Sequence, residues 1–397
     1  MPLQIGVGLS TLKDPILAAK EAALAARAQL YSDKTDLAIV FSCANLASET
    51  FLKTINIYSE CAHLVGASGL GIISNKGILR SGVIVLLLNL AENMRLASAC
   101  VKNIGAKPVW QSGEDLGGGL LLNFKNIRRN LGLIFSDGLI PNSSELIAGL
   151  QRRLGQSFPL IGASAADNLD FTKTYSYFGK EIIVKGASAL LWGGAKLNFG
   201  LGTKHGWRPL GKPHIVTKSS GNVVNEIDGE PAAKIYEEYI GKKISEIKEQ
   251  LKRISVFYPI GIKLAEENDF LLRNVFSIGR DNSLIFHGDV PENSSIRLMI
   301  GTKDTCLKAA SDAAEEARKK LGNKPCKFIL VFSSASRYIL LGRHANKELD
   351  IIKEKFGADT PIVGMYTYGE QAPLKDLSFR GKTYFHNQTI NILAIGG

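Results

Sequence analysis

Three apolar runs that each end in Phe-Ser constrain the fold of this chain more than any other feature. They are LAIVFS at 37–42, LGLIFS at 131–136 and FILVFS at 328–333. Each run is followed by a stretch of helical length and then by a short apolar run that ends in glycine, at Gly66, Gly162 and Gly364. The interval from phenylalanine to glycine is roughly 25 to 32 residues, which suits a strand, a crossover helix and a second strand. The runs are almost continuously apolar, as expected for strands that are covered on both faces.

The repeat extends outward on both sides. Alanine-rich segments at 14–30 and 304–322 precede the first and third Phe-Ser runs, and both predict helices. Asp14 and the proline after it are suited to the start of the first of these helices. Glycine-bearing apolar stretches at 3–10 and 295–302 come before the two helices, and another apolar run follows each closing glycine. The pattern predicts an α/β fold with mixed sheets, built from repeated strand-helix-strand units with helices packed on the sheets.

The length of the chain favours two domains, because 397 residues exceed what one ordinary core contains. Residues 198–230 are rich in glycine and β-branched side chains, so they predict hairpins that join two halves. A helix is expected from Pro231 onward, after a turn. We therefore expect a domain boundary near residue 222.

The net charge and the lengths of the apolar runs bear on whether the chain binds nucleic acid or spans a membrane. The net charge of +11 would permit contact with anionic surfaces, but glutamates are interleaved among the lysines of 241–253. This mixture is typical of a solvated surface, and we expect no nucleic-acid partner. The longest apolar run, at 83–88, is too short for a membrane span. Five cysteines without a CxxC pair and an N-terminus unlike a signal peptide predict a cytoplasmic location.

Several short strings resemble the FIST family, whose N- and C-terminal modules occur in bacterial signal-transduction proteins. The resemblance covers nearly the whole chain, and the strings are specific in combination rather than singly. They are VGAS at 65–68, IGASAADN at 161–168, KHGWRPLG at 204–211, NEIDGEPAAKIYEEYIG at 225–241, FYPIGI at 257–262, LIFHGDVPENSSIRLMIG at 284–301, FSSASR at 332–337 and GMYTYGEQAP at 364–373.

The resemblance implies a FIST N-terminal-like domain over 1–222 and a FIST C-terminal-like domain over 223–397. It also implies a cytoplasmic sensor of a small polar ligand, with an amino acid as one candidate, or alternatively a haem-based sensor of a gas such as nitric oxide. The chain departs from the family at SSAS, residues 333–336, where a cysteine is often found. No fused kinase, cyclase or methyl-accepting domain is recognised, so we expect output through a separate partner, such as a histidine kinase or a cyclic-dinucleotide enzyme.

Arg337 and Glu370 are the first candidates for ligand binding. Both follow the ends of apolar runs, and the carboxyl edge of an α/β sheet is where ligands bind. Arginine can hold a carboxylate with two hydrogen bonds, and Glu370 could face an ammonium group. Tyr366 and Tyr368 could provide flat walls with hydroxyl groups. A structural interpretation is equally open, in which Arg337 and Glu370 form an ion pair and the tyrosines belong to the core.

Glu370 also allows a function of another class, an enzyme in which it is the general base and Tyr366 or Tyr368 the acid. The spacing reveals no activated nucleophile and no metal-ligand set beside it. The sequence therefore favours a sensor and leaves an enzyme as an alternative.

Ser68 and Ser164 occupy equivalent positions, each two residues after a closing glycine. Small residues at such positions allow a ligand or another backbone segment to approach closely. Neither serine lies in a GxSxG string, so a hydrolase nucleophile is not indicated. The two serines are candidates for ligand contact or for tight packing of the loops.

His205 and Trp207, both in KHGWRPLG, are further candidates for ligand contact. His205 could be an axial haem ligand, bond a small ligand or fix a hairpin. The six histidines form no HxH, HxxxH or HExxH pattern, so no zinc or non-haem iron site is expected. The prediction is a chain without a cofactor, with haem as the open alternative.

The glycine-rich run at 115–119 resembles a phosphate-binding loop only superficially. It lacks the Lys-Ser/Thr pair of a Walker motif and the GxGxxG spacing. We expect a flexible turn at these residues.

Overall fold

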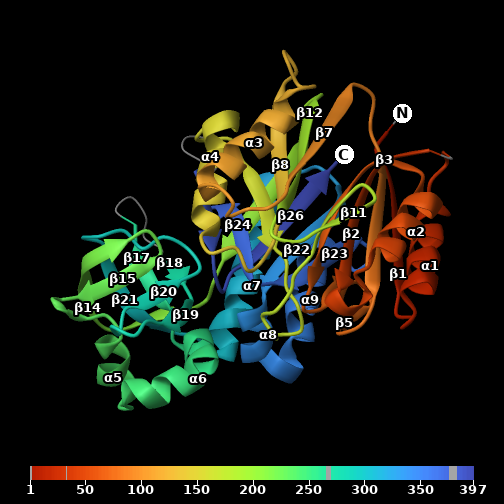
Figure 1. The fold of residues 1–397 in the computed structure, drawn as a ribbon. Helices are drawn as coiled ribbons and strands as arrows, with labels where there is room; N and C mark the ends of the chain where they lie inside the picture. Colours follow the sequence, from red (N-terminus) through yellow and green to blue (C-terminus); the bar gives the residue numbers. More distant parts are fainter. Residues whose placement is uncertain (1, 33, 265–269, 375–381) are drawn as a thin grey trace.

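The computed structural model describes residues 2–32, 34–264, 270–374 and 382–397, and its architecture is mixed α/β (Figure 1). Parallel and antiparallel strands form mixed sheets, and helices pack against them, which confirms the predicted fold class. Within these ranges no helix is both long enough and apolar enough to cross a membrane.

Three units with one strand order form a repeated core. In each unit the Phe-Ser strand lies between a closing strand, which is parallel to it, and a returning strand, which is antiparallel to it. An outer strand pairs with the returning strand. In the order outer, returning, Phe-Ser and closing, the strands are β1 (Gln4–Ser10), β6 (Val83–Asn89), β2 (Thr35–Cys43) and β3 (Cys61–Gly69); β7 (Met94–Val101), β12 (Ala187–Gly194), β8 (Arg129–Ser136) and β9 (Leu160–Ser164); and β13 (Asn198–Lys204), β26 (Ile390–Gly396), β22 (Cys326–Ser334) and β23 (Ile362–Thr367). The repeat read from the sequence is therefore present in the structure.

Each of these sheets is completed by a hairpin from a different unit. The hairpin of the first unit pairs with the closing strand of the third, that of the second unit with the first, and that of the third unit with the second. The hairpins, in chain order, are β4 and β5 (Ile72–Ser74, Gly77–Leu79), β10 and β11 (Ser176–Phe178, Glu181–Ile183), and β24 and β25 (Gly369–Pro373, Thr383–His386). The units thus exchange hairpins in a closed ring.

Helices cover the outer faces of the sheets. They are α1 (Pro15–Arg27) and α2 (Glu49–Ser59) in the first unit, α3 (Val109–Leu121) and α4 (Ser143–Leu154) in the second, and α7 (Lys303–Leu321), α8 (Ala335–Leu341) and α9 (Asn346–Phe356) in the third, with 3₁₀ turns at Ala44–Leu46 and Gly342–His344. Asp14 caps α1 as predicted, because its side chain accepts hydrogen bonds from the N–H groups of Ile16 and Leu17. Added Cβ atoms at Gly6 and Gly8 of β1 would lie 2.0 and 1.8 Å from carbonyl oxygens of α1, so glycine permits this close contact.

Three phenylalanines, one from each Phe-Ser strand, meet at the centre of the core. The ring centroids are 5.4 Å apart for Phe41 and Phe135, 5.7 Å for Phe41 and Phe332, and 5.8 Å for Phe135 and Phe332. All three pairs are edge-to-face, the arrangement that aromatic rings prefer in protein cores. The same residue type therefore joins the three sheets at equivalent positions.

A smaller body, here called the insertion, lies between β13 and α7 and extends to one side of the repeated core (Figure 1). Its elements are β14 (Arg208–Ser220), β15 (Val223–Ile227), β16 (Glu230–Pro231), α5 (Lys234–Ile240), α6 (Ile244–Phe257), β17 (Ile260–Lys263), β18 (Phe270–Arg273), β19 (Val275–Ile278), β20 (Leu284–Phe286) and β21 (Ser295–Ile300). The sequence suggested that 295–302 is the first strand of the third unit, but β21 pairs with β14 and β17 of the insertion. β13 is the outer strand instead, because it pairs with β26. Residue 222 lies in the turn between β14 and β15, and a domain division there stays a prediction.

The glycine run at 115–119 lies within helix α3 rather than in a turn, so that expectation is wrong. Glycines in α3 and α4 allow the two helices to pack closely. An added Cβ at Gly113 would lie 2.1 Å from Leu146 O, and one at Gly149 would lie 1.9 Å from Trp110 O. Tertiary packing therefore outweighs the low helix propensity of glycine here.

Candidate functional site

The chain leaves the three closing strands at one place in the core. At each exit a backbone hydrogen bond connects two units. The donor is the N–H group four residues after the closing glycine of one unit. The acceptor is the carbonyl oxygen two residues after the closing glycine of another unit. The bonds are Ala166 N to Ser68 O (2.8 Å), Leu70 N to Tyr366 O (3.0 Å) and Tyr368 N to Ser164 O (3.2 Å). The exits converge, and backbone hydrogen bonds between units hold them together.

Ser68 and Ser164 crosslink these exits from buried positions. Ser68 Oγ donates to Ala166 O at 2.9 Å and accepts from Tyr175 N at 3.1 Å. Ser164 Oγ accepts from Gln371 Nε2 at 2.9 Å. These bonds give both serines a structural role, and ligand contact by either one stays a prediction.

Arg337 is fully buried in α8 and pairs with Glu348 rather than with Glu370. Its Nε donates to Glu348 Oε1 at 2.9 Å, and Nη2 contacts the same oxygen. Nη1 donates to His205 O at 2.7 Å and Nη2 to Cys306 O at 2.8 Å. The guanidinium group thereby joins α8 to α9, to α7 and to the segment after β13.

Glu370 is fully buried in β24 and accepts hydrogen bonds from two threonines. Oε1 accepts from Thr367 Oγ1 at 2.6 Å, and Oε2 accepts from Thr389 N at 3.2 Å and Thr389 Oγ1 at 2.7 Å. Burial raises the pKa of Glu370 to about 8, although these hydrogen bonds favour the charged form. Thr367 lines the pocket described below, and Glu370 contacts that residue rather than the pocket.

The two tyrosines expected to act together have different surroundings. Tyr366 is fully buried, with its ring 5.0 Å from that of Tyr338, and its hydroxyl has no partner among the described residues. Tyr368 donates its hydroxyl to Asp167, and its ring stacks on Phe171 with centroids 4.5 Å apart. Of the two, Tyr368 is the one that lines the pocket.

His205 and Trp207 fix the chain between β13 and the insertion. Trp207 N donates to His205 Nδ1 at 2.9 Å, so the two residues form a tight local turn. Gly301 makes room for the indole ring, because an added Cβ there would lie 2.5 Å from Trp207 Cε2. These contacts give both side chains a structural role.

The cavity beside His205 does not suit a haem group. It has a volume of about 340 Å³, and several charged side chains line it. They are Lys204, Arg208, Lys308 and Asp312. A porphyrin has broad apolar faces. Covering charged side chains with these faces would remove the charges from water without pairing them, which costs free energy. The residues around His205 therefore do not fit this cofactor.

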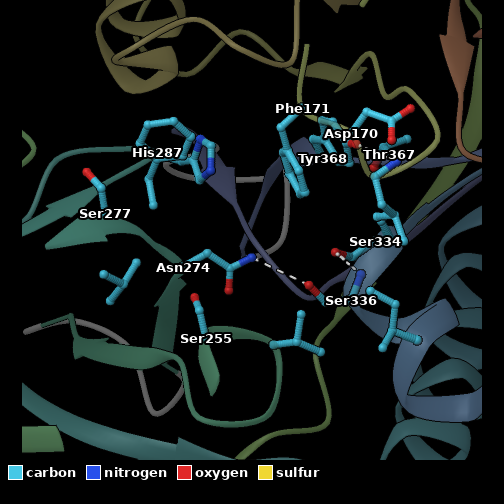
Figure 2. A pocket seen from close by; sticks show the side chains of 16 residues that line it. Asp170, Phe171, Ser255, Asn274, Ser277, His287, Ser334, Ser336, Thr367 and Tyr368 are labelled. Atoms are coloured by element: carbon cyan, nitrogen blue, oxygen red, sulfur yellow. Dashed lines mark hydrogen bonds between the residues drawn. The ribbon is translucent and has the colours of Figure 1, made fainter. Parts of the chain in front are cut away.

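A second cavity, also of about 340 Å³, lies where the insertion meets the repeated core (Figure 2). This cavity is called the pocket below. The insertion lines it with residues 255–256, 274–277 and 287; the second unit with 169–171; and the third unit with 334–336, 339 and 367–368. Small-molecule sites commonly occupy such junctions between domains.

Asp167 shapes one wall of the pocket. Its carboxylate accepts hydrogen bonds from the N–H groups of residues 170–173 and from the hydroxyl of Tyr368. Burial would raise the pKa of Asp167, but these hydrogen bonds outweigh it and keep the pKa below its usual value. Leu169 and Phe171 have φ angles of 73° and 56°, a strained conformation for residues other than glycine. The carboxylate thus holds the loop that carries Phe171.

Polar groups and aromatic rings face the pocket from different elements. Figure 2 shows His287 and Phe171 apart from each other in the upper part of the view, with Asn274 and Ser336 below them. Asn274 Nδ2 donates to Ser336 Oγ at 3.4 Å. Burial lowers the pKa of His287 to about 4, so its imidazole is neutral at neutral pH. The arrangement can bind a small ring-containing molecule through apolar contact and hydrogen bonds.

Sequence reasoning missed the contribution of the insertion to this pocket. Asn274 and Ser255 lie outside the strings that carried the family resemblance, whereas His287 lies within LIFHGDV and Ser336 within FSSASR. The last two strings could have drawn attention to these residues. Nothing in the sequence indicates that 255, 274 and 287 come together, because helix α6 and separate strands of the insertion place them at the pocket.

Comparisons with known proteins agree with the family resemblance. A profile of the FIST N domain matches residues 36–230, and one of the FIST C domain matches residues 232–373. An uncharacterised protein of Methanocaldococcus jannaschii is 26% identical over 369 residues, covering 83% of this chain and 69% of the relative. An uncharacterised protein of Mycobacterium tuberculosis is 23% identical over 380 residues, covering 94% of this chain and 95% of the relative.

Among solved structures, a cyanuric acid hydrolase from A. caulinodans covers 100% of both chains with a TM-score of 0.37 and 9% identity, values too low to support any inference. The two profile matches, by contrast, cover most of the chain. The chain belongs to the FIST family, whose domains are sensor domains of signal transduction.

Proposed function

We propose that this chain is a cytoplasmic sensor that binds a small polar ligand in the pocket between the insertion and the repeated core. One observation carries the proposal: the insertion, the second unit and the third unit all line this pocket. A ligand there would contact parts of the chain that are distant in sequence. Its binding would therefore favour one arrangement of these parts over another.

The contacts around the pocket define the arrangement on which a ligand would act. Arg273 of the insertion donates from Nη1 to Phe385 O at 2.7 Å, and Asn274 N donates to Asn387 Oδ1 at 3.1 Å. These bonds join the end of β18 and the residue that follows it to the third unit. A ligand produces a signal only if it binds one such arrangement more tightly than the other. A ligand with equal affinity for both arrangements would not change their populations.

The lining of the pocket bears on the kind of ligand. An amino acid is one candidate, but its carboxylate would need a cationic partner once it is removed from water. Asp170 is the charged side chain among the described lining residues, and no lysine or arginine is among them. Arg337, expected to bind a carboxylate, is engaged by Glu348. A ligand without a free carboxylate therefore fits the pocket better.

The proposed output is a contact with a separate signalling protein, such as a histidine kinase or a cyclic-dinucleotide enzyme. Membership of a signal-transduction family supports a partner of this kind. The cysteines at 43, 61, 100, 306 and 326 are all free, which supports a reducing cytoplasm as the location.

Ile339→Trp tests the proposal by filling the pocket. Ile339 lines the pocket from α8 and is 37% exposed, so the larger ring can be accommodated at its mouth. A small-molecule extract from cells in which the protein is native should raise the Tm of the wild type by several degrees and leave that of Ile339→Trp unchanged. Thermal denaturation followed by fluorescence gives the measurement, and mass spectrometry of the bound fraction identifies the ligand.

Ile57→Trp is the matched control, because Ile57 is 63% exposed on α2 and does not line the pocket. The control should respond to the extract as the wild type does. An equal response of Ile339→Trp would show that the ligand does not bind in this pocket, and the proposal would then be rejected.

A further inference from the structure

Ser255 has a hydroxyl group at the pocket, and no described residue forms a hydrogen bond with it. Its side chain is 4% exposed, and its Oγ has no partner among the described residues. A buried hydroxyl left unpaired costs free energy, so such groups are nearly always bonded to something. Ser255 lines the pocket from α6, and in Figure 2 its hydroxyl is directed toward Asn274. A ligand in the pocket would supply the missing partner.

Aromatic side chains stand on two sides of the same space. Phe171 is stacked on Tyr368, with planes inclined by 10°, so the pair presents a flat and fixed surface. Across the pocket, Phe276 and His287 are in edge-to-face contact at 5.0 Å. Phe276 lines the pocket and is 52% exposed, so part of its ring is open for contact with a ligand. Flat surfaces of this kind favour a planar ring.

The charge of the lining favours an uncharged ligand. Asp170, exposed at the rim, is the charged side chain of the described lining, and His287 is neutral at neutral pH. The other polar groups are hydroxyls and the amide of Asn274. These groups can pair with the donors and acceptors of a neutral molecule, but they cannot neutralise a carboxylate or a phosphate.

We propose that the ligand is an uncharged planar ring that lies against Phe171 and turns a hydrogen-bonding edge toward Ser255 and Asn274. The proposal rests on the proposed function, because it names the ligand class of the same pocket. Ser255 would be the specificity-determining residue for the polar edge, and the aromatic pairs would select for the ring.

Three probes of nearly equal size and shape differ in charge: benzamide is neutral, benzoate is an anion and benzamidine is a cation. We expect benzamide to bind the wild-type protein at least about tenfold more tightly than either charged probe, since neither charge finds a buried counter-charge. Ligand-observed NMR titration at millimolar concentrations measures these affinities. Ile339→Trp should abolish benzamide binding, and Ile57→Trp should preserve it.

Ser255→Ala tests the proposed hydrogen bond between Ser255 and the ligand separately from the stability of the fold. Since Ser255 Oγ has no partner among the described residues, its removal should leave the Tm unchanged or higher while weakening benzamide about two- to tenfold. Ser188→Ala is the matched control, because Ser188 also has a buried hydroxyl without a described partner but lies in β12, outside the pocket lining. Benzamide affinity should be unaffected in this control.

The outcomes separate this inference from the proposed function. If benzoate or benzamidine binds as tightly as benzamide and depends on Ser255, the uncharged class is wrong while the pocket remains a ligand site. If no probe depends on Ser255, the inference is wrong. The extract experiment with Ile339→Trp then decides the proposed function independently, because it assumes no ligand class.

Discussion

At the scale of single residues, Glu370 links stability to pH. Its pKa of about 8 in the folded chain compares with an ordinary value of 4.5. Between these values the folded chain holds a proton that the unfolded chain has released. The free energy of unfolding therefore falls as the pH rises from about 4.5 to about 8, by at most about 1.4 kcal/mol per pH unit from this group.

Glu370→Gln should remove this contribution. Glutamine is neutral and can still accept from Thr389 N while donating to Thr367 Oγ1. We expect the variant to lose less stability than the wild type between pH 5 and pH 8, and urea denaturation at both values measures the difference. Equal pH dependence in the two proteins would contradict a raised pKa for Glu370.

Residue chemistry was only partly readable from the sequence. The placement of Glu370 and Tyr368 just after a buried strand marked a segment that does border the pocket. The pairing of Arg337 could not be read, because Glu348 lies on the following helix, and several acidic residues stand at similar distances in sequence. Ser255 gives no sequence signal at all, since its importance comes from a hydroxyl that lacks a described partner.

At the scale of elements, some glycines in α3 are needed for close packing against α4, whereas others have room for a side chain. An added Cβ at Gly113 would overlap Leu146 O at 2.1 Å, whereas one at Gly118 would meet Arg153 Nη2 at an ordinary 3.6 Å. Gly113→Ala should destabilise the protein by about 1–3 kcal/mol through overpacking. Gly118→Ala should stabilise it by up to about 1 kcal/mol through helix propensity.

Urea denaturation of the two alanine variants provides the measurement. Each is a control for the other, because both change glycine to alanine within the same helix. Stabilisation by Gly113→Ala would show that α3 and α4 do not need this close approach.

The apolar pattern predicted which segments are strands better than it predicted which strands pair with one another. Continuous apolar runs and a fixed interval marked the Phe-Ser and closing strands, because burial on both faces leaves that signature. The outer strand of the third unit was misassigned to 295–302, since the insertion separates β13 from α7 by about a hundred residues. The hairpins β10 and β24 gave no indication of the sheet they join, because pairing across units is not encoded in local periodicity.

At the scale of the whole molecule, the exchange of hairpins should make the three units unfold together. Phe135→Ala removes one ring from the central cluster of Phe41, Phe135 and Phe332 and should cost about 3–5 kcal/mol. Hydrogen exchange should then show faster opening in the Phe-Ser strands of all three units, since each sheet depends on another unit.

Phe286→Ala is the control, because Phe286 is buried in the separate core of the insertion. Its effect should be largest in the insertion strands. Faster exchange confined to β8 and its neighbours in Phe135→Ala would mean that the units open independently.

The closed ring of hairpins also determines when the chain can finish folding during synthesis. The second unit, complete in sequence by residue 194, needs β24 (Gly369–Pro373) to pair with the edge of β9. A ribosome that makes the chain from its N-terminus therefore leaves this strand edge open until β24 has emerged. Open strand edges are sites of aggregation, so we expect the second unit to depend on rapid synthesis of the remainder or on a chaperone that shields the edge of β9.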